Sequence, residues 1–443
     1  YNGVIPGVSL QGDTFFYPNP LESDGVFAFN HGSAERQPWF GCSCCPTNIV
    51  RFIPSVPGFA VAHAGELLYV NLYLNAEATV AMPTGTVRLD IQTDYPWDGH
   101  VRVTIHPESP ATFTLCPRLP GWAQDQPVPS DLYTYLPVDH AGVTLTVNGT
   151  DTPLNLEKGF AMIRRTWKPG DTVELNLPMR PRRVVAHPSV VDDRDRVAFE
   201  RGPLVYCFEG VDNNGRVLNL FVTDDAPVTE TRQPDLLGGI VALDMPATAL
   251  ERQEDGTVAS RELTARAIPY YAWCHRGANE MLVWMPRTAA SAVPASPPTL
   301  ANRSKVSASY VCPTDSLRAV NDGAEPARSG DGSIPRMTWW DHKGTTEWIQ
   351  YEFPGLARVK GCAVYWFDDR PRGGCRIPQA WQVMFRENGA WKPVSGALLD
   401  EPRLNRWSEA QFEPVMTDAL RLEVTLQDGY SGGVLEWTLQ TAE

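Results

Sequence analysis

Three cysteines fall within one short stretch of the sequence, at Cys42, Cys44 and Cys45. A cysteine thiolate is both a strong nucleophile and a soft metal ligand, and zinc is the common metal that suits such ligands best. A bound cation also offsets the repulsion between neighbouring thiolates. The spacing therefore favours a metal site or a nucleophile at this point of the chain.

Two other interpretations of the cysteine cluster stay open. Free cysteines often serve as ordinary core residues. A disulfide between Cys44 and Cys45 is disfavoured, because adjacent Cα atoms lie about 3.8 Å apart, less than a disulfide normally spans. The spacing also leaves a zinc site incomplete, since zinc takes four ligands and the sequence has no second Cys-x-x-Cys and no His-x-x-x-His.

Several motifs accompany the cluster, which lies in the segment Trp-Phe-Gly-Cys-Ser-Cys-Cys-Pro-Thr-Asn at 39–48; the others lie at 1–4, 7–12, 15–22 and 200–206. Together they resemble family 127 of the glycoside hydrolases, the β-L-arabinofuranosidase family, and its relative family 146. The resemblance implies a retaining glycosidase in which a zinc-bound cysteine attacks the anomeric carbon. On the family pattern Cys44 is the nucleophile and a zinc ligand, and Cys45 is a second zinc ligand.

The sequence departs from the family pattern in one respect. In family members the acid/base glutamate and the other zinc ligands, a glutamate and a cysteine, lie far upstream of the cluster. Before Cys44 this chain has only Glu22 and Glu35, and neither stands in a Glu-x-Cys setting. The resemblance thus implies the C-terminal part of an enzyme, with the missing barrel segment as a partner. A rival interpretation is a non-catalytic carbohydrate-binding protein whose cluster is vestigial or a structural zinc clamp.

Composition limits the class of partner. The formal net charge of −14 argues against nucleic acid and anionic membranes, which attract clustered Lys and Arg, whereas neutral carbohydrate fits it. No apolar run is long enough for a membrane span, and residues 1–10 do not form a signal peptide. The nine scattered cysteines favour a reducing compartment. The choice between a cytoplasmic and a periplasmic location stays open.

Strand-like patterns dominate the chain. With 14 Trp, 14 Tyr, 16 Phe, 39 Pro and 35 Gly, the composition favours short strands joined by turns. We expect a mainly β protein in which the end of an (α/α)6 barrel precedes two β-sandwich domains and a C-terminal jelly roll. The expected domains are 1–63, with a short helix near Pro46, then 64–185, 186–300 and 301–443. A Pro- and Ala-rich segment at 289–298 has linker composition.

Two aromatic stretches need separate interpretations. The run Tyr-Tyr-Ala-Trp-Cys-His at 270–275 could form a sugar platform, but core packing is favoured because aromatic residues dominate cores. In the last domain, Trp339, Trp340 and His342 form the best binding-loop candidate, and Arg376 belongs to a second loop. Rings that stack on sugar, beside a few polar groups, are typical of carbohydrate sites.

Residues 301–443 resemble the discoidin-like carbohydrate-binding modules, as in family 32. The resembling parts are 319–323, 348–353 and 433–437. In such modules an Asp-Gly loop and a glutamate near the last strand often share a calcium ion, and Asp322 and Glu436 occupy those places. Hard oxygen donors suit calcium, although two carboxylates supply only part of its shell. Calcium is therefore a second expected cofactor, beside zinc.

Overall fold

The computed structural model describes residues 1–42, 44–137, 142–253, 257–295, 299–332 and 334–442. Strands dominate it, and within these ranges α1 (Cys44–Ser55) is the single α-helix, so the prediction of a mainly β chain is confirmed. The chain divides into two compact units, the first made of 1–22, 38–251 and 258–295, the second of 23–37, 252–257 and 296–443. Residues 296–298 of the expected linker lie outside the described residues.

Helix α1 carries the cysteine cluster. The short helix expected near Pro46 is present: it begins at Cys44 and places Pro46 inside its first turn, where a missing N–H costs no helical hydrogen bond. Pro54 lies in the last turn of the helix, which ends at Ser55, and a 3₁₀ turn (Val56–Phe59) follows. The cysteines are thereby fixed at a helix N-terminus. In the part of the chain that the structure describes, no helix is long and apolar enough to cross a membrane.

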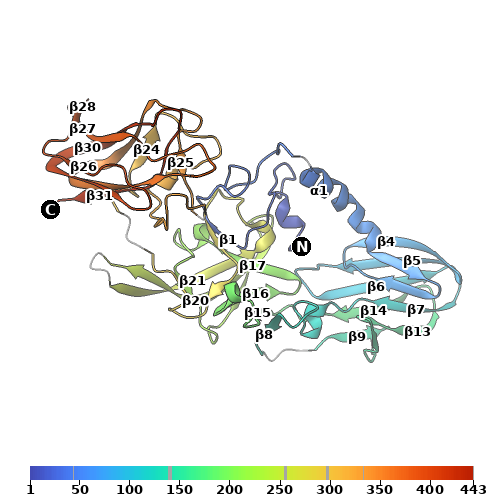
Figure 1. Cartoon of the computed structure of the whole chain (residues 1–443). Helices are drawn as coiled ribbons and strands as arrows, with labels where there is room; N and C mark the ends of the chain where they lie inside the picture. Colours follow the sequence, from blue (N-terminus) through green and yellow to red (C-terminus); the bar gives the residue numbers. More distant parts are fainter. Residues whose placement is uncertain (43, 138–141, 254–256, 296–298, 333, 443) are drawn as a thin grey trace. The chain divides into compact units, whose positions relative to one another are not determined.

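Two sheets of the first unit face each other across one core (Figure 1). One has six strands in the order β10-β9-β14-β6-β5-β4, and the other has four in the order β13-β7-β3-β2. The bounds are β2 Val61–Ala64, β3 Leu67–Val70, β4 Ala76–Met82, β5 Gly85–Thr93, β6 His100–Pro107, β7 Ala111–Pro117, β9 Thr144–Val147, β10 Thr150–Asp151, β13 Ile163–Trp167 and β14 Asp171–Asn176.

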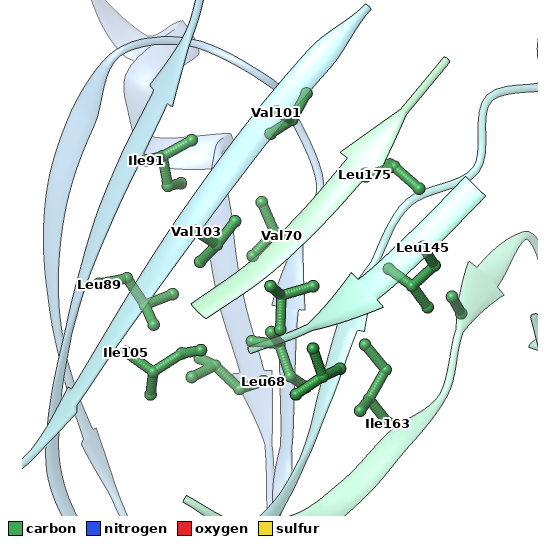
Figure 2. Packing of buried hydrophobic residues seen from close by; sticks show 14 of the residues in the cluster. Leu68, Val70, Leu89, Ile91, Val101, Val103, Ile105, Leu145, Ile163 and Leu175 are labelled. Atoms are coloured by element: carbon green, nitrogen blue, oxygen red, sulfur yellow. The ribbon is translucent and has the colours of Figure 1, made fainter. Parts of the chain in front are cut away.

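The alternation of residues in these strands explains the core. In β5 the buried residues are Val87, Leu89 and Ile91, every second position, because successive side chains of a strand point to opposite faces. Figure 2 shows Leu89 and Ile91 packed with residues of neighbouring strands, among them Val103, and with Leu68 of the other sheet. A turn at Asn148 and Gly149 joins β9 to β10, with positive φ at both residues.

A second sheet system of the first unit follows in sequence. Its main path runs β18-β20-β21-β17-β16-β15-β8. The bounds are β8 Tyr133–Tyr135, β15 Pro181–Ala186, β16 Arg196–Arg201, β17 Leu204–Glu209, β18 Leu220–Phe221, β19 Thr229–Gln233, β20 Ile240–Arg252, β21 Val258–Pro269, β22 Glu280–Leu282 and β23 Met285–Pro286. Trp273 and Tyr270 are buried, so the core interpretation of the aromatic run at 270–275 is confirmed.

The second unit holds an eight-stranded sheet, with the main path β25-β31-β26-β30-β27-β28. One long strand, β26, spans residues 346–367, and its pairing with β30 shifts between Glu352 and Ala357. The bounds are β24 Lys305–Ala308, β25 Met337–Thr338, β26 Thr346–Phe367, β27 Ala380–Glu387, β28 Ala390–Pro393, β29 Leu398–Leu399, β30 Ser408–Thr425 and β31 Gly433–Thr441.

Candidate active site

The three cysteines of the cluster meet through their sulfur atoms. Cys44 Sγ lies 3.4 Å from Cys42 Sγ and 3.9 Å from Cys45 Sγ. Cys42 and Cys44 are exposed and Cys45 is partly exposed, whereas the other six cysteines are buried. The interpretation of the cluster as buried core residues is therefore wrong for Cys42 and Cys44, and the sulfur of Cys44 is open to a ligand.

Tyr17 is a fourth member of this group, and it was not among the site residues predicted from the sequence. Its hydroxyl lies 4.0 Å from Cys44 Sγ, and its ring meets the buried ring of Phe40 edge-on, with centroids 5.6 Å apart. Only its place inside the family motif at 15–22 could have indicated this role. Because Tyr17 and Cys44 lie far apart in sequence, their proximity depends on the fold.

Residues on either side of Tyr17 are held by the aromatic run. Phe16 stacks on Trp273 with centroids 4.8 Å apart, and the Tyr270 hydroxyl donates a 2.7 Å hydrogen bond to the carbonyl of Pro20. These contacts join the second sheet system of the first unit to the loop that carries Tyr17. The buried aromatic residues at 270 and 273 thus hold the loop that carries Tyr17 in place through core contacts.

The surroundings shift the pKa values of the adjacent thiols of Cys44 and Cys45 in opposite directions. A hydrogen bond from Cys42, then contacts with Cys45 and Tyr17, lower the pKa of Cys44. Partial burial raises the pKa of Cys45. Hydrogen bonding to Cys45 and Cys44 raises the pKa of Tyr17 to about 12, so its hydroxyl keeps its proton at neutral pH. Of the two adjacent thiols, Cys44 is consequently the one that more readily becomes a thiolate nucleophile.

The two sulfurs of Cys44 and Cys45 fit half of a zinc site. Two thiolates bound to one tetrahedral zinc at 2.3 Å each lie about 3.8 Å apart, close to the 3.9 Å seen here. Among the described residues, no three His, Cys, Asp or Glu side chains are grouped so that they could hold a metal by themselves. Glu22 is turned to an ion pair with Arg196, 3.5 Å away. The remaining donors would have to come from elsewhere.

The two neighbouring tryptophans of the second unit differ in their exposure to solvent. Trp339 is fully buried, which corrects its prediction as a sugar-binding residue, because a ring without exposed surface cannot stack on a ligand. Trp340 is 39% exposed. Its ring lies under the side chain of Lys343, whose Nζ is 4.8 Å from the ring centroid. A ligand that stacks on that face would have to displace the flexible Lys343 side chain.

His342 and Arg376 are held by their own loops. Nδ1 of His342 shares a 2.7 Å hydrogen bond with Glu347 Oε1, which leaves Nε2 to meet a ligand. Arg376 Nη1 donates to the carbonyl oxygens of Gly373 and Cys375 at 3.0 and 2.6 Å, so this guanidinium mainly braces its loop. Its plane also covers the exposed ring of Tyr430, 4.5 Å from the centroid, a residue that was not predicted from the sequence.

Asp322 and Glu436, the expected calcium ligands, are brought together. Glu436 Oε2 accepts a 3.1 Å hydrogen bond from the Gly323 N–H, and the two carboxyl groups are within hydrogen-bonding contact. Burial raises the pKa of Glu436 to about 9 and that of Asp322 to about 6. A buried carboxyl pair of this kind is a reasonable partial site for a cation, because a bound charge would replace the shared proton.

Comparison with protein families covers most of the first unit. Residues 1–58 match the model described as beta-L-arabinofuranosidase, GH127 catalytic domain; residues 67–179 match the GH127 middle domain; and residues 181–286 match the glycoside hydrolase family 127 C-terminal domain. The three matches follow one another along the chain in the order of one family's domains.

Individual relatives agree with these matches. The chain is 34% identical over 312 residues to a non-reducing end beta-L-arabinofuranosidase of Bifidobacterium longum, covering 65% of this chain and 44% of the relative. A solved GH127 beta-arabinofuranosidase is 40% identical, with a TM-score of 0.62 over 66% of this chain and 45% of that chain. A GH127 beta-L-arabinofuranosidase of Geobacillus stearothermophilus T6 is 37% identical, with a TM-score of 0.56 over 64% and 44%. The chain thus spans under half the length of these relatives.

Proposed function

The chain belongs to glycoside hydrolase family 127, and we propose from this premise that it carries the nucleophile of a retaining β-L-arabinofuranosidase. The observation that supports the proposal is the position of Cys44, which is exposed at the N-terminus of α1 between two other sulfurs. The positive end of a helix dipole stabilises a thiolate, which favours attack by sulfur. Arabinose-containing plant glycans are the proposed substrates.

The proposed reaction has two steps. Cys44 Sγ attacks the anomeric carbon while the bond to the leaving oxygen breaks, and a general acid gives that oxygen its proton. Water then attacks the same carbon from the side of the departed group, and the carbon–sulfur bond breaks. The residue that acted as general acid in the first step now acts as base and accepts the proton of the water. Two inversions restore the original configuration. The chain's own contribution is the sulfur and the groups that orient it.

Zinc is the proposed cofactor, with Cys44 and Cys45 as two of its four ligands. When bound, zinc would keep both thiols deprotonated at neutral pH. Tyr17 keeps its proton, and its hydroxyl lies 4.0 Å from Cys44 Sγ, where it can donate to the thiolate or to a sugar oxygen. Removal of either cysteine should therefore weaken metal binding as well as attack.

Exposed apolar side chains on α1 support the proposal that a further helical segment packs against this helix. Phe52, Ile53 and Val50 of the helix and Phe59 of the following turn are all large apolar residues with exposed side chains. Apolar residues gathered on one short element favour burial against another element. We propose that the rest of an (α/α)6 barrel covers them and brings the acid/base glutamate and the missing zinc donors.

A second candidate function is sugar binding by residues 301–443, as a discoidin-like jelly roll. Trp340 offers an exposed aromatic ring, and His342, two positions later, has its Nε2 outside the bond to Glu347; a ring and a polar group of this kind suit a carbohydrate. The buried pair Asp322 and Glu436 is proposed to bind a structural calcium ion. This function requires no contribution from Cys44, so it can be tested separately.

Hydrolysis of an aryl β-L-arabinofuranoside tests the first proposal. We would assay the chain with zinc, alone and together with the helical half of a family 127 relative. Cys44→Ser should abolish phenol release, because a hydroxyl is a poor zinc ligand and a far weaker nucleophile. Cys312→Ala, which changes a buried thiol of the second unit, should keep the activity. Phenol release by Cys44→Ser at the rate of an active parent would refute the proposal.

A further inference from the structure

A polar pocket opens where several strands of the second unit end, at a place that no sequence motif indicated. It has a volume of about 660 Å³ and is lined by Pro378, Gln379, Glu401, Pro402, Gln427 and Asp428. These residues stand just before β27, just after β29 and just after β30. The pocket is large enough for a monosaccharide unit, since ligand pockets commonly measure about 300–1,000 Å³.

Hydrogen bonds fix each wall of the pocket. The Gln379 N–H donates to the Thr425 carbonyl at 2.8 Å, and the side chain of Gln427 donates to the Ile377 carbonyl at 2.8 Å. The third wall is held by Trp381, whose indole N–H donates to the carbonyl of Asp400 at 2.8 Å. The pocket is therefore formed before any ligand arrives, which lowers the entropic cost of binding.

The lining is rich in hydrogen-bond acceptors. Glu401 and Asp428 have no ion-pair partner among the described residues, and no Lys or Arg lines the pocket. Gln427 uses its N–H₂ group on the Ile377 carbonyl, so its Oε1 is the atom left for a ligand. Gln379 offers both an acceptor and a donor. Such a lining suits a ligand with many hydroxyl donors and disfavours an anionic one.

The loop 427–430, which supplies two residues to the pocket, also carries an aromatic residue. Tyr430 follows Asp428 by two positions, its N–H donates to the Gln427 carbonyl at 3.0 Å, and its ring is exposed. Across the loop, Gly344 lies so close to Asp428 that an added Cβ would be 3.6 Å from Asp428 Oδ1. The loop 427–430, which supplies Gln427 and Asp428 to the pocket, thus also contacts the loop that carries Trp340.

We propose that this pocket binds a non-acidic sugar unit, with the carboxylates of Glu401 and Asp428 accepting hydrogen bonds from its hydroxyl groups. The inference rests on the second candidate function, sugar binding by residues 301–443, and deepens it. It places the ligand in a pocket whose lining does not include Trp340, and it specifies the charge of the ligand. Carboxylates commonly accept from neighbouring hydroxyls, and these bonds are stronger than those between neutral groups.

Ligand-observed NMR on the full chain tests the proposal, with D-galactose and L-arabinose as neutral probes, D-galacturonate as the acidic probe, and Ca²⁺ alone. The neutral sugars should bind better than galacturonate. Asp428→Ala and Gln379→Ala should each weaken neutral-sugar binding by about tenfold, the loss expected for a charged or buried hydrogen bond. Glu387→Ala, a change at the opposite end of β27 where Glu387 pairs with Lys392, is the matched control and should have no effect.

The possible failures can be told apart. Binding that is lost in Trp340→Ala but kept in Asp428→Ala would overturn the pocket and leave the second candidate function standing. Binding of no sugar at all would overturn both. Uptake of Ca²⁺ that Asp428→Ala abolishes, without sugar binding, would make the pocket a cation site and refute the inference. None of these results bears on hydrolysis by Cys44.

Discussion

The ring of Phe16 lies against the indole of Trp273, with centroids 4.8 Å apart and planes 14° from parallel. This contact joins the loop that precedes α1 to the second sheet system of the same unit. Tyr17, the next residue, extends toward Cys44. The position of the tyrosine at the sulfur cluster therefore depends on a core contact that is distant in sequence.

Loss of the buried indole should destabilise this unit strongly. We expect Trp273→Ala to lower the free energy of unfolding by about 3–5 kcal/mol, because it leaves a cavity under Phe16. Tyr270→Phe removes only the hydroxyl that binds the Pro20 carbonyl and should cost about 0.5–1.5 kcal/mol. Urea unfolding measures both values. The control is Trp39→Ala, which changes an exposed ring; equal losses in Trp39→Ala and Trp273→Ala would contradict the role of the stack.

Exposure of the cluster predicts a labelling pattern. Iodoacetamide in the absence of zinc should modify Cys42 and Cys44 first, because both are exposed, while the buried Cys116, Cys207 and Cys362 stay unmodified in the folded chain. Zinc should protect Cys44 and Cys45, since a metal-bound sulfur is a poorer nucleophile. Peptide mass mapping with and without zinc follows each site. Equal protection of all three cluster cysteines, or none, would disagree with the proposed ligand pair.

An ion pair should make the first unit sensitive to acid. Arg266 donates to both oxygens of Asp244 at 2.7 and 3.0 Å, and these bonds hold the pKa of Asp244 below its usual range. A carboxyl with a lowered pKa in the folded state stabilises the protein above about pH 4, and the contribution is lost as pH falls through the folded-state pKa. Asp244→Asn should cost about 1–2 kcal/mol at pH 7 and less at pH 3.

The control for this change is another Arg–carboxylate pair. Arg261 and Glu251 contact each other at 3.2 Å, but both side chains are largely exposed. Glu251→Gln should therefore shift stability by under about 1 kcal/mol at either pH. Thermal melts at pH 3, 5 and 7 compare the two variants. A cost for Asp244→Asn that does not change with pH would show that the charge of Asp244 is not the cause.

Calcium should stabilise the second unit if Asp322 and Glu436 share it. We expect millimolar Ca²⁺ to raise the melting temperature of the chain and EDTA to reverse the change, because a ligand that binds only the folded state shifts unfolding. Glu436→Gln should remove the response while keeping the shape of the side chain. Glu413→Gln offers a comparison on another strand. A Ca²⁺ response that survives in Glu436→Gln would place the ion elsewhere.

The sequence alone predicted much of the fold because period-two patterns and turn residues are local signals. It predicted the strands around Val103 and Leu175 and the cluster at Cys44. It could not tell which of Trp339 and Trp340 is buried, since both are tryptophans and only packing separates them. Likewise, no local signal pairs Tyr17 with Cys44 or joins Gln379 to Asp428 across one pocket, because these contacts link distant segments.

The most direct test asks which atom becomes bonded to the sugar. An aryl β-L-arabinofuranoside with an acidic phenol needs little help from a general acid, so the cysteine can be examined with zinc in the complex of the chain and the helical half of a family 127 relative, which would supply the remaining zinc donors. Rapid acid quench followed by peptide mapping should show one pentosyl group on Cys44, and none in Cys44→Ser. A pentosyl group on a carboxylate, or phenol release that persists in Cys44→Ser, would contradict the proposed cysteine nucleophile.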